Sequence, residues 1–380
     1  MANSNFTNDG VRCMMLRGGS SKGAYFLADD LPADPESRDT LLRQVMGSPD
    51  VRQIDGIGGA HPLTSKVAIV GPSSSPDADV DYLFLQVGVD TPVVSDQQNC
   101  GNLLAGVGPF ALERGLLPAP PSSADNEMTV RIRMLNTDSV AVAQFHLQDS
   151  HPRYRATEAQ GGVAVSGVPG VASPITLTFR NIEGASCGAL LPTGQPVDHI
   201  DGVACTLIDN GMPVVVMAAA DFGLAGDESC ADLESNAALT QRLEAIRLQA
   251  GPLMNLGDVA NTTVPKMTLV SPPRGRGVLT TRTFIPHRCH DAIGVLGAVS
   301  VASAALLPDS PAANAASLPE NLDPGALGGA GMVQVELEHP TGTFTAVITT
   351  ETHEPGQLLN VQSAGIVRTA RKLMDGLVFP

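Results

Sequence analysis

The chain has 380 residues, 43% of them hydrophobic, with 39 glycines, 29 prolines and no tryptophan. This length accommodates two or three domains, and the glycine and proline content favours many short strands and turns over long helices. The formal net charge of −16 argues against a nucleic-acid-binding surface, so an anionic ligand would need a local cluster of cations.

The N-terminal segment and the cysteines indicate a reducing compartment. The first ten residues lack the basic region and the apolar core of a signal peptide. The longest apolar stretch, 292–307, is short for a membrane span and predicts a buried helix. Six cysteines without a CxxC pair form neither a disulfide framework nor a zinc pattern. We therefore expect a cytoplasmic protein that binds neither membranes nor nucleic acid.

The first predicted elements are two strands joined by a glycine-rich turn. Strands over 11–16 and 24–27 flank the segment Arg17-Gly-Gly-Ser-Ser-Lys-Gly23. Such a turn can present N–H groups and cations to an anion, and the alternative is a simple hairpin with solvated cations. It is not a P-loop, because the spacing to Lys22 is wrong and no helix-forming segment follows.

The next elements lead to a lysine at the start of a strand. We predict a helix over 39–46, a loop over 52–59, an apolar strand over 67–70 directly after Lys66, and a strand over 81–90. Lys66 is therefore placed to point into a cleft. A surface lysine at a sheet edge is the more common alternative.

The segment from Val94 to Gly115 centres on a cysteine. Polar residues lead into Asn99-Cys100-Gly101-Asn102, and the small apolar residues that follow predict a buried helix, which Pro109 should kink. A thiol at a helix N-terminus faces free N–H groups and the positive end of the helix dipole, and this setting favours the thiolate. The alternative for a single cysteine is an inert, buried thiol.

The remaining predicted elements are strands bounded by turn residues, and they cover 129–136, 140–147, 175–179, 332–339, 343–350 and 361–371. A loop rich in Ala, Pro, Gly and Asn is expected over 308–331.

The second half of the chain repeats the first. Matching segments surround Cys13 and Cys205, Lys66 and Lys266, and Cys100 and Cys289, in the same order and at a nearly constant separation. This period is far longer than that of a solenoid repeat. We therefore predict an α+β protein of two homologous halves, each a mostly antiparallel sheet around one apolar helix that begins at a cysteine.

The repeat also predicts the domain boundaries. The first domain is expected over 1–198 and contains Lys66 and Cys100, and the second is expected over 199–380. A return of the last strand to the first domain is left open.

This arrangement suggests acid–base chemistry at an anion site. Helix N-termini supply free N–H groups to an anion. A Cys100 thiolate can remove a proton next to a carbonyl group, and Lys66 can return it or stabilise the enolate; the reverse assignment, with neutral Lys66 as the base, stays open. No metal or other cofactor is expected, because His287 and His290 lack an acidic partner at helical spacing.

Symmetry makes Cys289 a candidate second thiol, as a two-base racemase would need. The second copy reads Cys289-His290-Asp291 in place of Cys-Gly-Asn, so His290 can fill the cleft or bind a substrate. We therefore treat Cys289 as the weaker candidate. The other four thiols are expected to be structural: Cys13, Cys187, Cys205 and Cys230.

Five segments together resemble the PrpF family: Arg17–Gly23, Gly58–Lys66, Asn99–Asn102, Leu191–Gly194 and His287–His290. The resemblance covers nearly the whole chain. It implies the diaminopimelate-epimerase-like fold of two pseudo-symmetric barrels, each around a central helix. It also implies a cofactor-independent isomerase whose catalytic pair falls on Lys66 and Cys100.

Four further segments resemble the family members that isomerise 4-oxalomesaconate in gallate and protocatechuate catabolism: Met46–Asp50, Arg52–Gly56, Ala105–Leu116 and Ile285–His290. This implies a keto–enol or allylic isomerisation of a tricarboxylate. Three positions depart from the expected pattern. Ser20 keeps the hydroxyl of the expected threonine, whereas His61 and Gln195, in place of Asp and Asn, bear on substrate contacts rather than on the reaction class.

Three carboxylates would need several holders. The candidates are Arg17, Ser20, Lys22, Asn99, Gly101, Asn102, Lys266, Arg288 and His290. Three alternative functions remain: an isomerase of methylaconitate or aconitate, an amino-acid racemase or epimerase, and a carboxylate-binding protein without activity. The sequence leaves the oligomeric state open, a homo-oligomer included.

Overall fold

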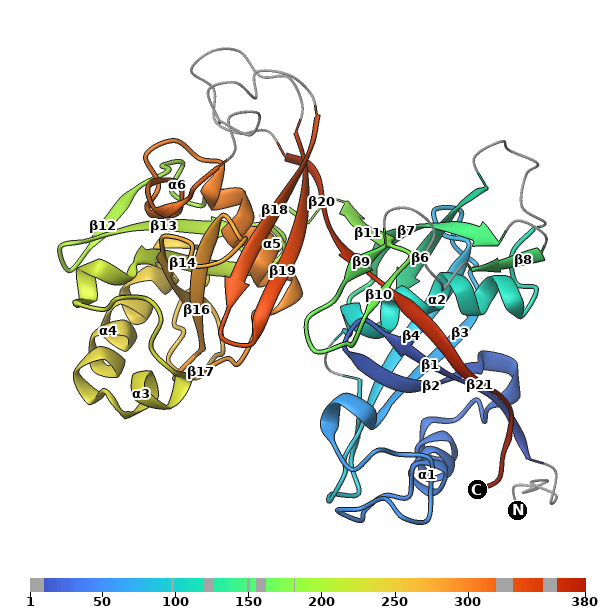
Figure 1. Ribbon diagram of the computed structural model, residues 1–380. Coiled ribbons are helices and arrows are strands. Elements are labelled where there is room, and N and C mark those ends of the chain that lie inside the picture. The colour runs from blue at the N-terminus through green and yellow to red at the C-terminus, as the bar shows by residue number, and fades with distance from the viewer. Residues whose placement is uncertain are drawn as a thin grey trace. The chain divides into compact units, whose positions relative to one another are not determined.

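The computed structural model describes residues 10–96, 99–118, 126–148, 151–154, 162–180, 182–318, 331–350 and 361–380. It divides into two compact units, and each contains one half of the repeat. Unit 1 comprises residues 1–177 and 368–380, and unit 2 comprises residues 178–367. The C-terminal strand thus belongs to unit 1, and in Figure 1 it is the red strand beside the blue ones.

The sheet of unit 1 runs in the order β21-β1-β2-β3-β4-β6-β7-β8. Two of these pairs are parallel, β2 with β3 and β4 with β6, and the other pairs are antiparallel. The strands are β1 (Val11–Gly18), β2 (Ser21–Leu27), β3 (Lys66–Pro72), β4 (Val80–Val87), β5 (Val94–Ser95), β6 (Glu127–Met134), β7 (Ser139–Gln148), β8 (His151–Tyr154) and β21 (Ala370–Val378). A small hairpin of β9 (Val163–Ala164) and β10 (Val171–Ala172) and the strand β11 (Ile175–Arg180) follow β8 in the chain.

Helix α2 (Gly101–Glu113) lies in the centre of unit 1, where it packs against β1, β2, β3, β4, β6, β8 and β21. The helix continues through Pro109, and it is buried throughout from Leu103 to Leu112. Two glycines make room for aromatic rings: a Cβ on Gly106 would lie 2.4 Å from the Tyr25 hydroxyl oxygen, and one on Gly108 would lie 2.6 Å from the Phe145 ring. The prediction of a buried helix after Cys100 is confirmed.

Helix α1 (Pro35–Met46) covers the face of the sheet that is turned away from α2. Its residues Leu41, Leu42, Val45 and Met46 are buried in one apolar cluster with side chains of β1 to β4, such as Phe26. The helix begins four residues before the predicted start, because the Asp34 carboxylate accepts a hydrogen bond from the Ser37 N–H and Pro35 occupies the first position.

Unit 2 repeats this topology. Its sheet runs in the order β12-β13-β14-β15-β16-β18-β19-β20, with β14 parallel to β15 and β16 parallel to β18. The strands are β12 (Asp198–Ile200), β13 (Val203–Asp209), β14 (Pro213–Ala218), β15 (Lys266–Ser271), β16 (Leu279–Ile285), β17 (Arg288–Cys289), β18 (Gly331–His339), β19 (Gly342–Thr350) and β20 (Val361–Arg368). Helix α5 (Val295–Ala305) is buried against β13, β14, β18 and β19, as α2 is in unit 1. The α+β class and the repeated architecture are confirmed.

Unit 2 also contains α3 (Cys230–Ser235), α4 (Ala237–Leu253) and α6 (Pro311–Ala315). Helix α6 lies in the stretch predicted as a loop, because Ser310 caps its N-terminus by accepting a hydrogen bond from the Ala313 N–H. Residues 319–330 of that predicted loop lie outside the described residues. No described helix is long and apolar enough to cross a membrane.

Two sequence predictions at the second half need correction. Cys289 does not begin a helix: it pairs with Phe284 in the short strand β17, and the His290 N–H donates to the Thr283 carbonyl oxygen, which prolongs the strand. Helix α5 starts only after Gly294. The stretch predicted as one last strand over 361–371 covers β20 and the start of β21, and β21 continues to Val378, because it pairs with β1 along its whole length.

Candidate active site

Cys100 is the N-cap residue of α2, as the sequence predicts. Its backbone is extended, with φ −126° and ψ 96°, and its side chain makes no capping hydrogen bond. The residue is 9% exposed. The thiol is therefore placed beside the first helical N–H groups, where the helix dipole favours negative charge.

Two buried tyrosines hold the first turn of α2. The Tyr25 hydroxyl donates to the Leu103 carbonyl oxygen at 2.5 Å, and the Tyr82 hydroxyl donates to the Cys100 carbonyl oxygen at 3.4 Å. Burial raises the pKa of both phenols well above the ordinary value, and the negative charge of Cys100 raises it further. Both hydroxyls therefore stay protonated and fix the backbone next to the thiol.

Lys66 is the first residue of β3 and is only 7% exposed. Its Nζ donates to Gln86 Oε1 at 2.7 Å and lies 4.9 Å from the centre of the Phe84 ring. The Gln86 amide nitrogen donates to the carbonyl oxygens of Pro62 and Ser65, so the amide oxygen must face Lys66. The prediction that Lys66 stands at a strand start is confirmed, and the lysine is buried rather than at the surface.

Lys66 and the N-terminus of α2 lie on the same face of the sheet. Val67 and Leu85 belong to the apolar cluster against α1, so their neighbours in sequence, Lys66 and Gln86, point to the other face. That face is the one covered by α2. The structure therefore places Lys66 and Cys100, the two residues predicted as a catalytic pair, on the same face of one sheet.

The turn between β1 and β2 meets the first turn of α2 through Asn102. The Asn102 amide nitrogen donates to Ser20 Oγ at 3.2 Å. A Cβ on Gly18 would lie 2.3 Å from the Asn102 carbonyl oxygen, and one on Gly19, which has φ +49°, would lie 2.2 Å from Asn102 Oδ1. Only glycine permits this approach, so the glycine-rich turn allows the hairpin to pack directly against the N-terminus of α2.

Arg368 is a residue of this cluster that the sequence analysis missed. It ends β20, is 7% exposed and donates from Nε to Asn102 Oδ1 at 3.1 Å. Burial lowers the pKa of its guanidinium to about 10, and the Cys100 charge acts in the opposite direction. The sequence signal that could have identified Arg368 is a charged residue directly after the apolar segment Gly365-Ile-Val.

Asn99 precedes the thiol and is held by the β6–β7 turn. Its amide nitrogen donates to Thr137 Oγ1 at 2.7 Å. Its Oδ1 is buried and has no hydrogen-bond partner among the described residues. An unpaired buried acceptor costs free energy, so Oδ1 is available to a donor group of a ligand.

Arg17 and Lys22 do not share the face of Cys100. Ser21, Gly23 and Tyr25 of β2 approach α2, so Lys22 between them points to the opposite face. Arg17 pairs with Lys22 and therefore lies on the same side. Its guanidinium donates to the carbonyl oxygens of Gly19 and Thr369.

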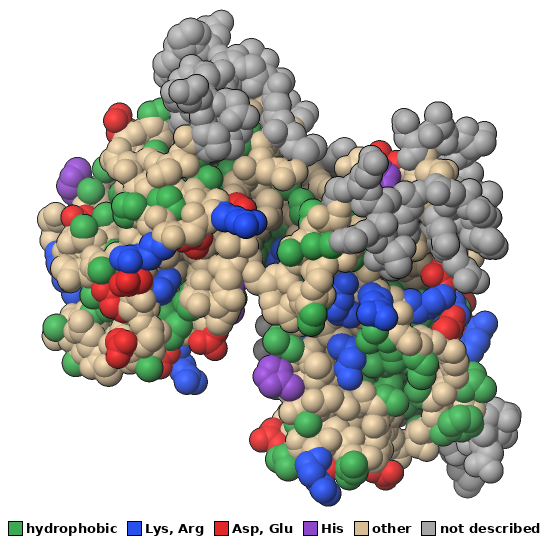
Figure 2. Space-filling model, in the orientation of Figure 1, with side chains coloured by type: hydrophobic (Ala, Val, Ile, Leu, Met, Phe, Trp, Pro, Cys, Tyr) green, Lys and Arg blue, Asp and Glu red, His purple; other side chains and the backbone are tan. Residues whose placement is uncertain are grey.

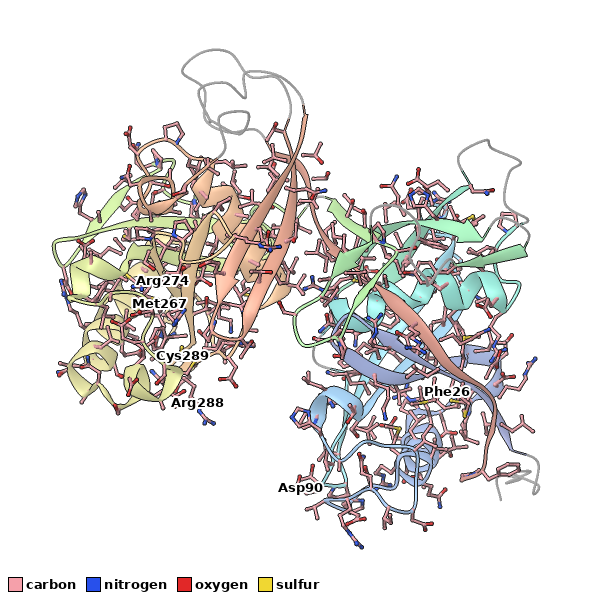
Figure 3. All side chains as sticks on the ribbon, viewed as in Figure 1. Phe26, Asp90, Met267, Arg274, Arg288 and Cys289 are labelled. Atoms are coloured by element: carbon pink, nitrogen blue, oxygen red, sulfur yellow. The ribbon has the colours of Figure 1, made fainter. Side chains whose placement is uncertain are left out.

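The other three predicted substrate holders lie in unit 2. Lys266 begins β15, as Lys66 begins β3, and burial lowers its pKa, with a smaller contribution from Arg247. The Arg288 side chain is 87% exposed and points outward in Figure 3, whereas Cys289 lies inside the unit. The His290 ring accepts the Ala292 N–H through Nδ1.

Cys289 is a poor second base. Burial raises the pKa of its thiol above the ordinary value, and the neighbouring Cys230 thiol raises it further. The residue also lacks the helix N-terminus that Cys100 has.

Among the described residues, no three His, Cys, Asp or Glu side chains form a group that could hold a metal ion.

The buried thiols give a direct chemical prediction. Burial raises the pKa of Cys13, Cys187 and Cys205 to about 12, so at pH 7.5 these thiols are protonated and weakly nucleophilic. We expect iodoacetamide to leave all three unmodified in the folded protein and to modify them after unfolding in urea, as measured by peptide mass spectrometry. Modification in the folded protein as fast as that of the half-exposed Cys230 would contradict the prediction.

Comparison with known proteins adds to this geometry. The sequence pattern of the family described as "PrpF protein" matches residues 9–380. The chain is 55% identical to a (4E)-oxalomesaconate Delta-isomerase of Novosphingobium sp., covering 98% of each chain. It is 54% identical to a 4-oxalomesaconate tautomerase of Pseudomonas putida, covering 97% of this chain and 95% of the relative. The crystal structure of a methylitaconate-delta-isomerase has a TM-score of 0.83 at 30% identity, covering 98% of this chain and 96% of that one.

Proposed function

Because the chain belongs to the PrpF family and is an isomerase, we propose that it isomerises 4-oxalomesaconate by acid–base proton transfer without a cofactor. The observation that carries the proposal is the placement of buried Lys66 and the N-cap thiol of Cys100 on one face of one sheet. Two relatives that share more than half of their aligned residues with this chain are named for oxalomesaconate.

In this mechanism the Cys100 thiolate removes a proton from a carbon atom next to a carbonyl group. The electron pair moves onto the carbonyl oxygen and forms an extended enolate. Lys66 stabilises that charge as an ammonium group and then donates a proton at a different carbon atom. A proton passes from the Cys100 thiol to the Lys66 amine, directly or through solvent, and restores both groups. The Phe84 ring lies 4.9 Å from Nζ, at a distance that suits a cation–π contact, and the reverse assignment, with Lys66 as the base, stays open.

Polar groups around the thiol are proposed to hold the carboxylates. In unit 1 these are Ser20, Asn99 and the N-terminal residues Gly101 and Asn102 of α2. The roles of Lys266, Arg288 and His290 in unit 2 stay predictions.

Six free cysteines agree with a cytoplasmic enzyme, and the substrate would place it in gallate or protocatechuate catabolism.

The test is an absorbance assay with freshly prepared 4-oxalomesaconate in D₂O. We expect rapid turnover by the wild type and deuterium in the recovered substrate. Cys100→Ser should lower kcat at least about a hundredfold, because a serine hydroxyl is a much weaker acid than a thiol. Cys230→Ser is the matched control and should behave as the wild type.

Two outcomes would contradict the proposal. Full turnover and full exchange by Cys100→Ser would exclude the thiol. No turnover of 4-oxalomesaconate by the folded wild type, together with turnover of 2-methylaconitate or aconitate in the same assay, would keep the isomerase class and exclude the substrate.

A further inference from the structure

Three cations stand side by side on the face of unit 1 that is turned away from α2. Arg17 on β1 pairs in register with Lys22 on β2 and with Arg371 on β21. Residues directly opposite on neighbouring strands point to the same face. Strands are about 4.8 Å apart, so three positive charges are anchored across roughly 10 Å of sheet.

This arrangement is unfavourable without an anion. Like charges directly opposite one another on a sheet destabilise it. The pKa of Arg17 is lowered, mainly by burial, and the Arg371 charge contributes to the lowering. The mutual repulsion of the three cations would be relieved by a bound negative charge.

Other cations nearby have carboxylate partners, whereas none of these three has one among the described residues. Arg114 pairs with Asp375, and Lys372 pairs with Glu113. No described carboxylate lies within ion-pair distance of Lys22 or Arg371. In a chain with a net charge of −16, this is a local excess of positive charge.

The three cations line a cavity of about 950 Å³. The opposite wall comes from the β9–β10 hairpin and its flanks, with the apolar side chains Val163, Val165, Val168 and Val171, and no acidic residue lines the cavity among the described residues. Figure 2 shows Lys and Arg side chains gathered over β1, β2 and β21. A ligand here meets positive charge on one side and apolar surface on the other.

We propose that this cavity is a second anion-binding site, which takes a small organic di- or tricarboxylate. Its acid groups would bind Arg17, Lys22 and Arg371, and its carbon skeleton would pack on the valine wall. The site lies on the opposite face of the sheet from Lys66 and Cys100, so it binds without taking part in proton transfer. The proposal does not depend on the isomerase substrate.

Isothermal titration calorimetry with citrate as the probe, in a low-salt buffer, tests the site. Arg371→Met should weaken citrate binding about tenfold, because it removes one charge-assisted contact. Arg12→Met is the matched control: it removes the same charge from β1, but Arg12 has its own partner in Asp30, so citrate binding should be unchanged. Lys66→Met should also leave this binding unchanged.

Three results would overturn the proposal. The first is no citrate binding by the wild type. The second is equal weakening by Arg371→Met and Arg12→Met, which would indicate a general charge effect. The third is loss of binding in Lys66→Met and not in Arg371→Met, which would place the anion at the candidate active site. One further result would support the site. If citrate inhibited turnover by the wild type and did not inhibit Arg371→Met, the bound carboxylate would be a regulator rather than a second substrate molecule.

Discussion

A Lys66→Met variant is expected to lose about a thousandfold of kcat, because it removes a positioned acid from the site. Methionine has a similar length and an unbranched apolar stem, so it can occupy the same buried position on β3. The fold should survive, although Gln86 Oε1 would lose its partner. The measurement is kcat with 4-oxalomesaconate, alongside the circular dichroism spectrum and Tm of the variant.

The repeat supplies an instructive comparison. Lys266→Met changes the equivalent first residue of β15, and we expect it to raise KM with a much smaller effect on kcat. Lys372→Met removes only a partly exposed ion pair with Glu113 and should act as the neutral control. A Lys66→Met protein that retains more than a tenth of the wild-type kcat would exclude Lys66 as the proton donor.

The local parts of the candidate site were predictable from the sequence. Lys66 follows a polar turn and precedes an apolar run, and Cys100 stands between a polar segment and a small apolar one. Both positions depend on the switch from turn to strand or from turn to helix, which neighbouring residues determine. The repeat then linked them, and the structure confirms both placements.

The equivalence of Cys289 and Cys100 failed for a local reason that the sequence match concealed. The two segments align as Cys-x-x, but the second makes two further hydrogen bonds: the Cys289 N–H donates to the Glu234 carboxylate of α3, and the His290 N–H donates to the Thr283 carbonyl oxygen of β16. These contacts keep the chain extended, so α5 begins after Gly294. The similarity of the two segments therefore does not extend to a helix start at the cysteine.

Contacts between distant parts of the chain were not predictable. Arg368 reaches Asn102 because β21 returns to pair with β1, a pairing that no local pattern signals. The face of Lys22 depends on the register of the β1–β2 hairpin, in which Gly18 pairs with Ser21. Shifting a strand by one residue exchanges its two faces, and the predicted strand ends at 16 and 24 left that register undetermined.

Gly18→Ala is expected to lower kcat about a hundredfold and the free energy of unfolding by about 1–3 kcal/mol. The new Cβ would lie 2.3 Å from the Asn102 carbonyl oxygen, which is a backbone atom at the start of α2 and cannot rotate away. The hairpin and the helix must therefore separate. That movement shifts Asn102 and Ser20 relative to the Cys100 thiol, and small displacements of reacting groups have large effects on rate.

Gly376→Ala is the matched control, because Gly376 lies on β21 in the same sheet and a Cβ there would meet nothing within 4 Å. Its kcat and urea unfolding midpoint should equal those of the wild type. If Gly18→Ala lost stability but kept its kcat, the hairpin would be a structural support only, and the substrate contacts proposed for Ser20 and Asn102 would be excluded. If the folded fraction of Gly18→Ala stayed close to one and kcat still fell, the loss of rate would come from the site itself. The chemistry would then depend on the close contact between this glycine turn and the helix that carries the thiol.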